Sequence, residues 1–198
     1  MPSLVAPALP PGTLSAHPQP VLADGPLRLR PWAEADVPGL VSAYQDPEIQ
    51  RWHARSMSEQ GASAWVAAAR SAWTEESAAS WAVDDEGSLV GRMTLSVDMI
   101  EGTAVAAYWT TAPARGRGVA TAALGLATSW AFGVGVHRIE LEHSTLNTGS
   151  CRVARRAGFD LEGVRRDGAR HADGWHDMHI HARIDATSSR RSPGPTLL

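Results

Sequence analysis

The sequence has very little cysteine and no long apolar run, and both absences narrow the class of protein. Cys151 is the single cysteine among 198 residues, so no disulfide can form within the chain, which fits a reducing compartment. No apolar stretch approaches the roughly 20 residues that cross a bilayer. The first 20 residues lack the basic start of a secretion signal, and prolines interrupt its apolar core. We therefore predict a cytoplasmic protein with no membrane partner.

A large excess of one charge is also missing. The chain has 18 basic and 21 acidic residues and a net charge of −3. Proteins that bind nucleic acids usually carry a basic surface, so we predict no nucleic-acid partner. The apolar fraction of 43% and the eight tryptophans exclude a wholly disordered chain, and the length suits one domain with a single core.

The two ends of the sequence differ in composition from its middle. Residues 1–26 are rich in proline, alanine and other small residues, and residues 186–198 contain a run of serine, arginine and proline. Such compositions are typical of segments that do not pack. We predict a single domain over residues 27–185 between two disordered tails, 1–26 and 186–198.

Within residues 27–185, the spacing of apolar residues predicts both strands and helices. The expected strands are 27–31, 80–83, 89–97, 105–110, 138–144, 159–164 and 175–184. The expected helices are 36–45, 59–73, 116–132 and 150–157, with Ser58 as an N-cap. Strands clustered early and helices interspersed predict an α+β fold with a mixed sheet.

The segment after the expected strand 105–110 carries the clearest functional signal. A turn containing Arg115, Gly116, Arg117 and Gly118 leads directly into a strongly helix-forming run. The first amides of a helix have no partner within it, and the macrodipole adds about half a positive charge there. Glycine lets the backbone approach an anion closely, and arginine supplies fork-shaped donors. The segment therefore predicts a phosphate site.

Two common phosphate motifs do not fit this turn. A P-loop needs a lysine after its glycines, and none is present here; the third glycine of a dinucleotide fingerprint is replaced by Thr121. The spacing Arg115-x-x-Gly118-x-Ala120 instead resembles the acyl-CoA pyrophosphate loop of the GCN5-related N-acetyltransferase (GNAT) superfamily, which reads Gln/Arg-x-x-Gly-x-Gly/Ala.

Three further segments carry the same resemblance. Residues 147–159 look like the superfamily's Asn-x-x-Ser motif followed by a short helix and Gly-Phe. Residues 27–32 and 173–184 are similar to the first and last strands of its ribosomal-protein-alanine N-acetyltransferase-like branch. The resemblance implies a GNAT fold, with a mixed, mostly antiparallel sheet of six or seven strands flanked by about four helices. It is also compatible with a homodimer.

The resemblance implies acetyl-CoA as co-substrate and assigns residues to it. The turn would hold the pyrophosphate, the strand before it would lie along the pantetheine arm, and Asn147 would bond that arm or the adjacent backbone. The implied set is Trp109, Thr110, Thr111, Arg115, Gly116, Arg117, Gly118, Val119, Ala120, Thr121, Asn147 and Ser150.

The proton donor for the departing thiolate differs from the commonest pattern of the superfamily. Many members place a tyrosine seven residues after the asparagine, where this chain has Ala154. The ribosomal-protein branch uses the serine three residues after it, which implies Ser150 as the catalytic residue here. As a helix cap, Ser150 would need no catalytic role.

The general base is not identified by the resemblance. Several relatives place a glutamate on the strand before the turn, where this chain has the apolar residues 104–107. The ribosomal-protein branch can also place one after the last glycine-rich turn, where this chain has Ala169. Glu142 and His143 remain as candidates on the strand that enters the asparagine motif, and alternation turns them to opposite faces. A chain of water molecules with no dedicated base is an equal alternative.

A metal site and a covalent intermediate are two further possibilities that the side chains raise. His171, His176, His179 and His181 lie close together in sequence, but a strand would turn His176 away from the last two, and no helical histidine pair or cysteine partner supports zinc. Cys151 could form an acyl intermediate beside a histidine, although a small apolar role in a helix is commoner. We predict no metal.

The sequence thus predicts an N-acetyltransferase that transfers acetyl directly from acetyl-CoA to a primary amine. By analogy with the branch, the acceptor is a protein N-terminal α-amine. The alternatives are a small amine, such as an antibiotic, a polyamine or a metabolite, and a non-catalytic acyl-CoA-binding module.

Overall fold

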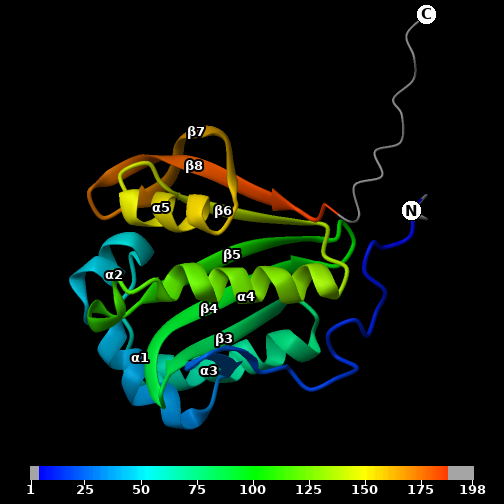
Figure 1. The fold of residues 1–198 in the computed structure, drawn as a ribbon. Helices are drawn as coiled ribbons and strands as arrows, with labels where there is room; N and C mark the ends of the chain where they lie inside the picture. Colours follow the sequence, from blue (N-terminus) through cyan, green and yellow to red (C-terminus); the bar gives the residue numbers. More distant parts are fainter. Residues whose placement is uncertain (1–4, 187–198) are drawn as a thin grey trace, which may run out of the picture.

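The computed structural model describes residues 5–186. Its centre is one eight-stranded sheet in the order β1-β2-β3-β4-β5-β6-β8-β7 (Figure 1). The strands are β1 (Leu22–Asp24), β2 (Leu27–Pro31), β3 (Ala78–Asp85), β4 (Ser88–Asp98), β5 (Thr103–Thr110), β6 (Arg138–Ser144), β7 (Asp160–His171) and β8 (Gly174–Ile184). Neighbouring strands are antiparallel except β5 and β6, which are parallel.

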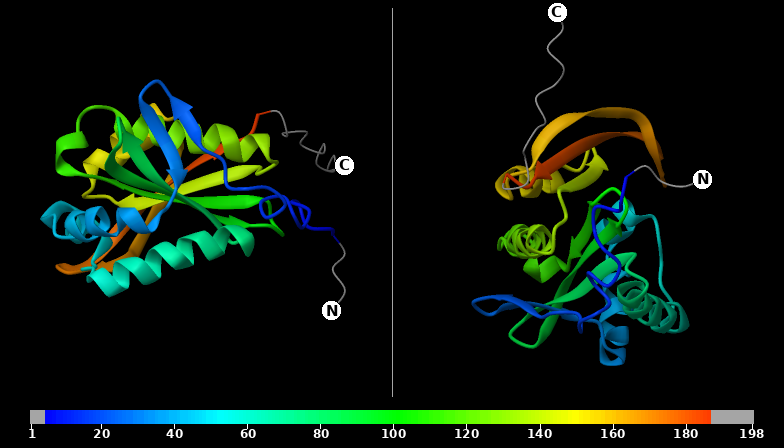
Figure 2. Two further views of the ribbon diagram at one scale, coloured as in Figure 1. Left: turned by 90° about the horizontal axis from the view of Figure 1, so that it is seen from below. Right: turned by 90° about the vertical axis from the view of Figure 1, so that its right-hand side faces the viewer.

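Within residues 5–186, five α-helices cover the two faces of this sheet. They are α1 (Val37–Ala43), α2 (Pro47–His53), α3 (Glu59–Thr74), α4 (Val119–Gly133) and α5 (Thr148–Arg156). Figure 2 shows α4 and α5 on one face and α1 and α3 on the opposite one. The α+β fold with a mixed, mostly antiparallel sheet that was expected from the sequence is confirmed, with one strand and one helix more than expected.

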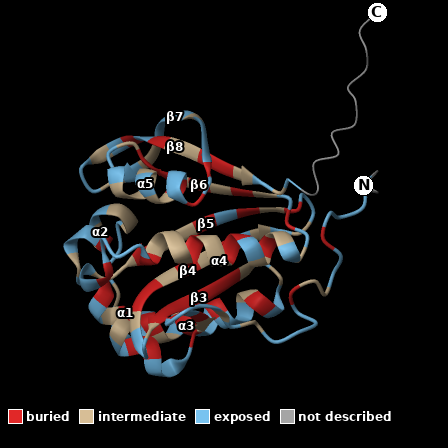
Figure 3. Ribbon diagram, viewed as in Figure 1, coloured by how far each residue is buried: buried red, intermediate tan, exposed pale blue. Residues whose placement is uncertain are grey.

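Two groups of buried side chains hold the layers together, one on each face of the sheet. The group under α4 includes Trp81, Met93 and Leu124, and the group under α1 and α3 includes Leu40 and Ala82. Trp81 and Ala82 are neighbours on β3 that point to opposite faces, as strand alternation requires. Figure 3 shows buried residues along β3, β4 and α4.

The pairing of β5 with β6 ends halfway along both strands. It runs from Thr103 opposite Arg138 to Ala106 opposite Leu141 and stops there. Beyond this point β5 stays paired with β4 as far as Thr110, and β6 stays paired with β8 as far as Ser144. The two strands therefore separate, as Figure 1 shows. We call residues 107–110 and 142–144 and the opening between them the splay.

The prediction of a disordered tail over residues 1–26 is wrong for the part that the structure describes. Leu9 and Leu14 are each only 1% exposed, and residues 22–24 form the edge strand β1. The side chain of Glu76 accepts the backbone N–H groups of Gly12 and Leu14, both at 2.8 Å. Residues 1–4 and 187–198, the latter predicted to be disordered, lie outside the described residues.

The segment 46–55 also differs from expectation. The sequence pattern predicts only a connection between two helices here, whereas the structure forms α2 over Pro47–His53. Asp46 begins this helix, because its side chain accepts the backbone N–H of Glu48 at 2.9 Å. Among the described residues no helix is long and apolar enough to cross a membrane.

Candidate functional site

The turn between β5 and α4 has the backbone conformation that an anion site needs. Gly116 and Gly118 have φ values of +75° and +84°, in the region that favours glycine. Gly118 is the N-cap of α4 and offers no side chain to the first helical amides. A Cβ atom built at Gly118 would meet nothing within 4 Å. The start of α4 therefore borders open space in which an anion can be held.

The two arginines of this turn are placed differently. Arg115 lines the cleft in front of α4, and its guanidinium lies 2.6 Å from the Asp46 carboxylate. Arg117 lies outside the cleft lining and bonds Asp85 on the β3–β4 hairpin at 2.8 Å. The geometry thus supports a phosphate role for Arg115 and gives Arg117 a role in anchoring the turn.

The cleft in front of α4 has a volume of about 500 Å³. Of the residues implied for the co-substrate, its lining contains all except Thr111 and Arg117: Trp109, Thr110, Arg115, Gly116, Gly118, Val119, Ala120, Thr121, Asn147 and Ser150. The lining also carries Arg51, Arg152 and Arg156 against the single acid Glu48. Its charge therefore suits a polyphosphate.

Trp109 contributes to this cleft mainly through its backbone. Its side chain is buried among the residues under α1 and α3, with its ring centroid 6.1 Å from that of Tyr44. The ring is therefore a core aromatic, while the main chain lies on the splayed edge of β5. One carbonyl on this edge, that of Tyr108, is already bonded by His53 Nε2 at 3.2 Å.

A second, smaller cleft of about 220 Å³ lies against the first one. The two clefts share Trp52, His53, Tyr108, Asn147 and Ser150 in their linings. The second cleft continues to Ala106, Glu142, His143 and Met178 and so lies along the splay. Two compartments that meet at one serine can hold a donor and an acceptor on either side of it.

Ser150 is positioned by the start of helix α5. The side chain of Asn147 is the N-cap of α5 and accepts the backbone N–H of Ser150 at 3.0 Å. The asparagine-to-serine spacing that carried the family resemblance is therefore also a helix-capping spacing. The local bond accounts for the position of Ser150 in both clefts, whatever its chemical role.

Tyr108 is a site residue that the sequence reasoning did not find. It lines both clefts, and its hydroxyl is buried without a partner at hydrogen-bonding geometry. Burial raises the pKa of Tyr108 to about 12, although the nearby Ser150 hydroxyl acts in the opposite direction. The phenol is neutral at physiological pH and can donate a proton. Strand alternation could have revealed it, because burying Trp109 in the core turns Tyr108 to the other face.

Glu142 and His143 both line the second cleft but have different surroundings. Glu142 is ion-paired with Arg165 of β7, so its carboxylate already has a cationic partner. His143 is buried, and its Nδ1–H donates to the Ser144 carbonyl at 2.8 Å. Burial lowers the pKa of His143, against the effect of that carbonyl, and the neighbouring histidines lower it further. Neither residue has the surroundings of an evident general base.

In the structure, the four neighbouring histidines of the sequence fall into two separate groups. His176 is fully bonded, with Nδ1 2.9 Å from the Ser144 hydroxyl and Nε2 2.9 Å from Asp173. The His171 ring stacks on the His176 ring at 4.2 Å. His179 and His181 instead gather with His143 and Cys151. The expectation that no cysteine accompanies these histidines is therefore wrong.

Comparison with known proteins agrees with this geometry. Residues 26–160 match the model of the acetyltransferase (GNAT) domain. The chain belongs to the GNAT acetyltransferase family. A stretch of 84 residues is 34% identical to the probable N-acetyltransferase YjcK of Bacillus subtilis, and this match spans 42% of the chain and 46% of that relative. The match thus covers about half the length of the curated relative.

Solved structures of the GNAT fold superpose over most of the chain. One is the ribosomal L7/L12 alpha-N-protein acetyltransferase RimL in complex with coenzyme A, with a TM-score of 0.78, 22% identity, and coverage of 83% of this chain and 98% of that one. Another is the microcin C7 self-immunity acetyltransferase MccE with acetyl-CoA and AMP, with a TM-score of 0.78, 20% identity, and coverage of 86% and 99%. At these identities the likeness establishes the fold.

Proposed function

We propose that this protein is an acetyl-CoA-dependent N-acetyltransferase that transfers acetyl directly to a primary amine, in the first place a protein N-terminal α-amine. The observation that carries the proposal is the pair of clefts that share Ser150 and Tyr108 at the splay. One cleft has the features of a diphosphate and pantetheine site, and the other opens beside the point where the thioester would lie.

The donor side is supported by the turn and the splayed strand together. The first amides of α4, the open space at Gly118 and the Arg115 guanidinium suit the pyrophosphate. The pantetheine arm contains amides, and the free edge of β5 beyond Ala106 offers backbone groups of the kind that an added strand would use. An extended arm bound along this edge would carry its thioester to Ser150.

The chemistry needs a neutral amine and a proton for the thiolate. The amine nitrogen attacks the thioester carbonyl, a C–N bond forms, the C–S bond breaks, and the sulfur leaves with the electron pair. The Ser150 hydroxyl donates its proton to that sulfur, and the Tyr108 phenol, which lies beside it, resupplies the serine. The proton that the nitrogen loses as the amide forms returns to Tyr108 through water in the second cleft, so the site ends in its starting state. Holding both reactants in line supplies much of the remaining rate.

Water removes the proton of the incoming ammonium in this proposal. Glu142 is paired with Arg165, and His143 is buried with its Nδ1 bonded to Ser144. Each is therefore a weaker candidate than water entering through the second cleft. This arrangement suits an α-amine, whose reference pKa of about 8 leaves a neutral fraction near physiological pH, better than an alkyl amine of higher pKa.

The test is thiol release from acetyl-CoA with two panels of acceptors: peptides with free N-termini, and small amines that include polyamines and aminoglycosides. The chain contains no lysine, so acetylation of the enzyme's own lysines cannot contribute to the signal. Turnover of peptides that disappears when their N-termini are blocked would support the proposal. Turnover confined to small amines would identify these, instead of protein N-termini, as the acceptors. Acetyl-CoA binding without any turnover would show that the protein is a non-catalytic binding module.

A further inference from the structure

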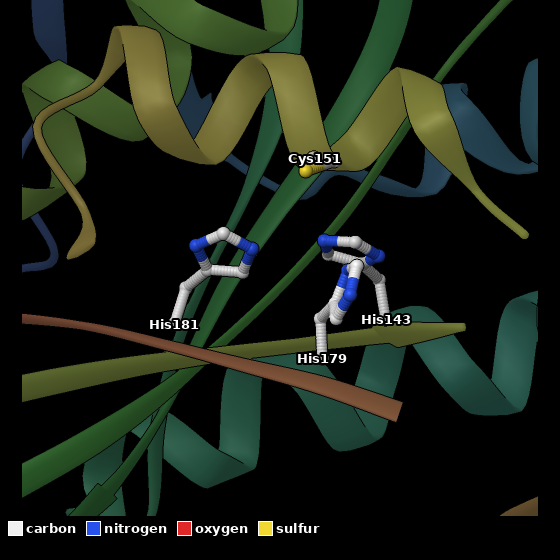
Figure 4. Close-up of side chains that lie close together, drawn as sticks. All are labelled: His143, Cys151, His179 and His181. Atoms are coloured by element: carbon white, nitrogen blue, oxygen red, sulfur yellow. The ribbon is translucent and has the colours of Figure 1, made fainter. Parts of the chain in front are cut away.

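Three imidazoles and one thiol meet between the sheet and helix α5, beside the second cleft. His143 on β6 lies directly opposite His179 on β8, and His181 follows two residues later on the same face. Cys151, in the first turn of α5, lies over this face. Figure 4 shows all four side chains directed into the space between the helix and the two strands.

The nitrogens that point into this space lack hydrogen-bond partners. His143 Nε2, His179 Nδ1 and both ring nitrogens of His181 are buried and have none. His181 is 0% exposed and His143 is 6% exposed. Burying a polar atom without a partner costs free energy, and native structures rarely leave several such atoms together. A bound ligand would give these nitrogens a partner, so the cluster is a candidate binding site.

The surroundings orient one of these rings as metal ligands are oriented. His143 donates its Nδ1–H to the Ser144 carbonyl at 2.8 Å, which leaves the lone pair on Nε2. A histidine that binds a metal usually gives its second ring nitrogen to a carbonyl in this way.

We propose that His143, Cys151, His179 and His181 bind one divalent transition-metal ion, zinc by preference. Their ligand atoms all lie within 4.8 Å of one another. Bonds of about 2.0–2.3 Å in a tetrahedral site place ligand atoms roughly 3.3–3.8 Å apart. Binding therefore requires a contraction of about 1 Å at the widest pair, which side-chain rotation can supply.

The chemistry of the four ligands selects the class of ion. Three imidazoles and a thiolate suit zinc and its neighbours in the first transition row, whereas calcium and magnesium require oxygen ligands. The His176 ring shows the contrast within the same strand, since both of its nitrogens are bonded to Ser144 and Asp173. The cluster is thus distinct from the hydrogen-bonded histidine beside it.

An ion bound at this position would have a structural effect on helix α5. It would link α5 to β6 and β8 through Cys151, whose chain neighbour is Ser150. A bound ion would therefore hold the start of α5 against the sheet. This role is independent of acetyl transfer, so its test does not need a known acceptor.

The first experiment uses the full chain without an affinity tag, freed of metal by chelation. Zinc is titrated against a chromophoric chelator, and the alkylation rate of Cys151 by a maleimide is followed. Because the chain has one cysteine, that rate reports on this site alone. We expect one equivalent of zinc to bind and to slow alkylation at least about tenfold. Cobalt(II) should give visible d–d bands and a thiolate charge-transfer band.

Variants separate the site from adventitious binding. Cys151→Ser should abolish the charge-transfer band. His179→Ala should weaken zinc binding at least about tenfold, because even the loss of a residue that only hydrogen-bonds a ligand weakens metal binding by about that factor. His17→Ala, at an exposed histidine outside the cluster, is the matched control and should change neither. Zinc that leaves Cys151 as reactive as before, or equal binding by His179→Ala and His17→Ala, would overturn the proposal. Circular dichroism of each variant checks that it is folded.

Discussion

Asn147 Oδ1 accepts the backbone N–H of Ser150 at 3.0 Å, so one side chain both begins helix α5 and positions the hydroxyl shared by the two clefts. The bond uses only the carbonyl oxygen of the amide, and the NH₂ group is a separate donor. Capping and co-substrate binding are therefore distinguishable roles of the same residue.

Asn147→Ala should lower the free energy of unfolding by about 1 kcal/mol through loss of the cap, and it should also weaken acetyl-CoA binding. Asn147→Ser keeps a capping oxygen and removes the NH₂ donor, so it should be nearly as stable as the wild type but still bind acetyl-CoA more weakly. Urea denaturation and calorimetric titration measure the two effects. Wild-type affinity in Asn147→Ser would reduce the residue to a cap.

The open space at Gly118 makes a sharp test of the phosphate site. Asparagine tolerates positive φ better than most residues, and aspartate has the same shape with a negative charge. Gly118→Asn should therefore weaken acetyl-CoA binding moderately, and Gly118→Asp should abolish it, because a carboxylate would face the pyrophosphate. Gly125→Ala, within α4 where a Cβ meets nothing, should bind normally. Equal affinities for the Asn and Asp variants would argue against an anion at this turn.

Ser150 and Tyr108 should behave as a single path for the proton. Ser150→Ala should lower kcat by roughly 10²-fold, the usual size of a general-acid effect, with little change in the affinity for acetyl-CoA. Tyr108→Phe should lower kcat less, since water can replace the phenol. In a serial relay the double variant is no slower than Ser150→Ala. Multiplicative losses would contradict the relay, and a kcat for Ser150→Ala within twofold of wild type would leave Ser150 with its structural role. Ser71→Ala, an exposed serine of α3, is the control.

Asp36 gives the fold a defined sensitivity to acid. Its carboxylate accepts two bonds from Arg30, at 2.7 and 2.8 Å, and the backbone N–H of Ala33 at 2.9 Å. Burial raises the pKa of Asp36, but these bonds outweigh it and the pKa is lowered overall. A carboxyl group with a lower pKa in the folded state stabilises the protein above the unfolded pKa of about 3.9, and this contribution is lost as the pH falls through the folded value.

Asp36→Asn should therefore lower the free energy of unfolding at pH 7 by about 2–3 kcal/mol, below the range for fully buried pairs because Arg30 is 28% exposed. The difference from wild type should begin to shrink below about pH 4, where the carboxyl group of the unfolded chain takes up its proton, and should be lost once the pH falls below the lowered pKa of the folded state. Urea denaturation at several pH values measures it, with the exposed Asp24→Asn as control. A difference that stays constant down to pH 2 would rule out the ionised pair as its source.

Local patterns in the sequence predicted the local parts of the site. Ser58 was expected to cap the helix 59–73, and its hydroxyl accepts the backbone N–H of Gly61 at 3.1 Å. The turn with Gly116 and Gly118 was expected from spacing and has the required positive φ values. Each of these features depends on a few neighbouring residues, so a single sequence is sufficient to reveal it.

The grouping of histidines could not be predicted in the same way. His143 meets His179 only because β6 and β8 pair in one particular register, and a slip of one residue would turn one set to the other face. Cys151 joins them because α5 folds back over the preceding strand β6, and β8, which carries the other two histidines, lies much further along the chain. The sequence pattern identified the four neighbouring histidines, but two of them belong elsewhere.

The N-terminal segment shows how average composition can mislead. Proline and alanine dominate it, yet two buried leucines and a few backbone hydrogen bonds are enough to hold it. Composition could not reveal these bonds, because the Glu76 side chain that accepts them lies more than sixty residues away. Leu14→Ala should lower the free energy of unfolding by about 2–5 kcal/mol, the usual cost of emptying a buried leucine site. Val5→Ala, at a residue that is 76% exposed, should change it by less than about 0.5 kcal/mol. If the segment does not pack in solution, both substitutions will have equally small effects in urea denaturation; a clear difference between them means that residues 5–24 are part of the folded domain.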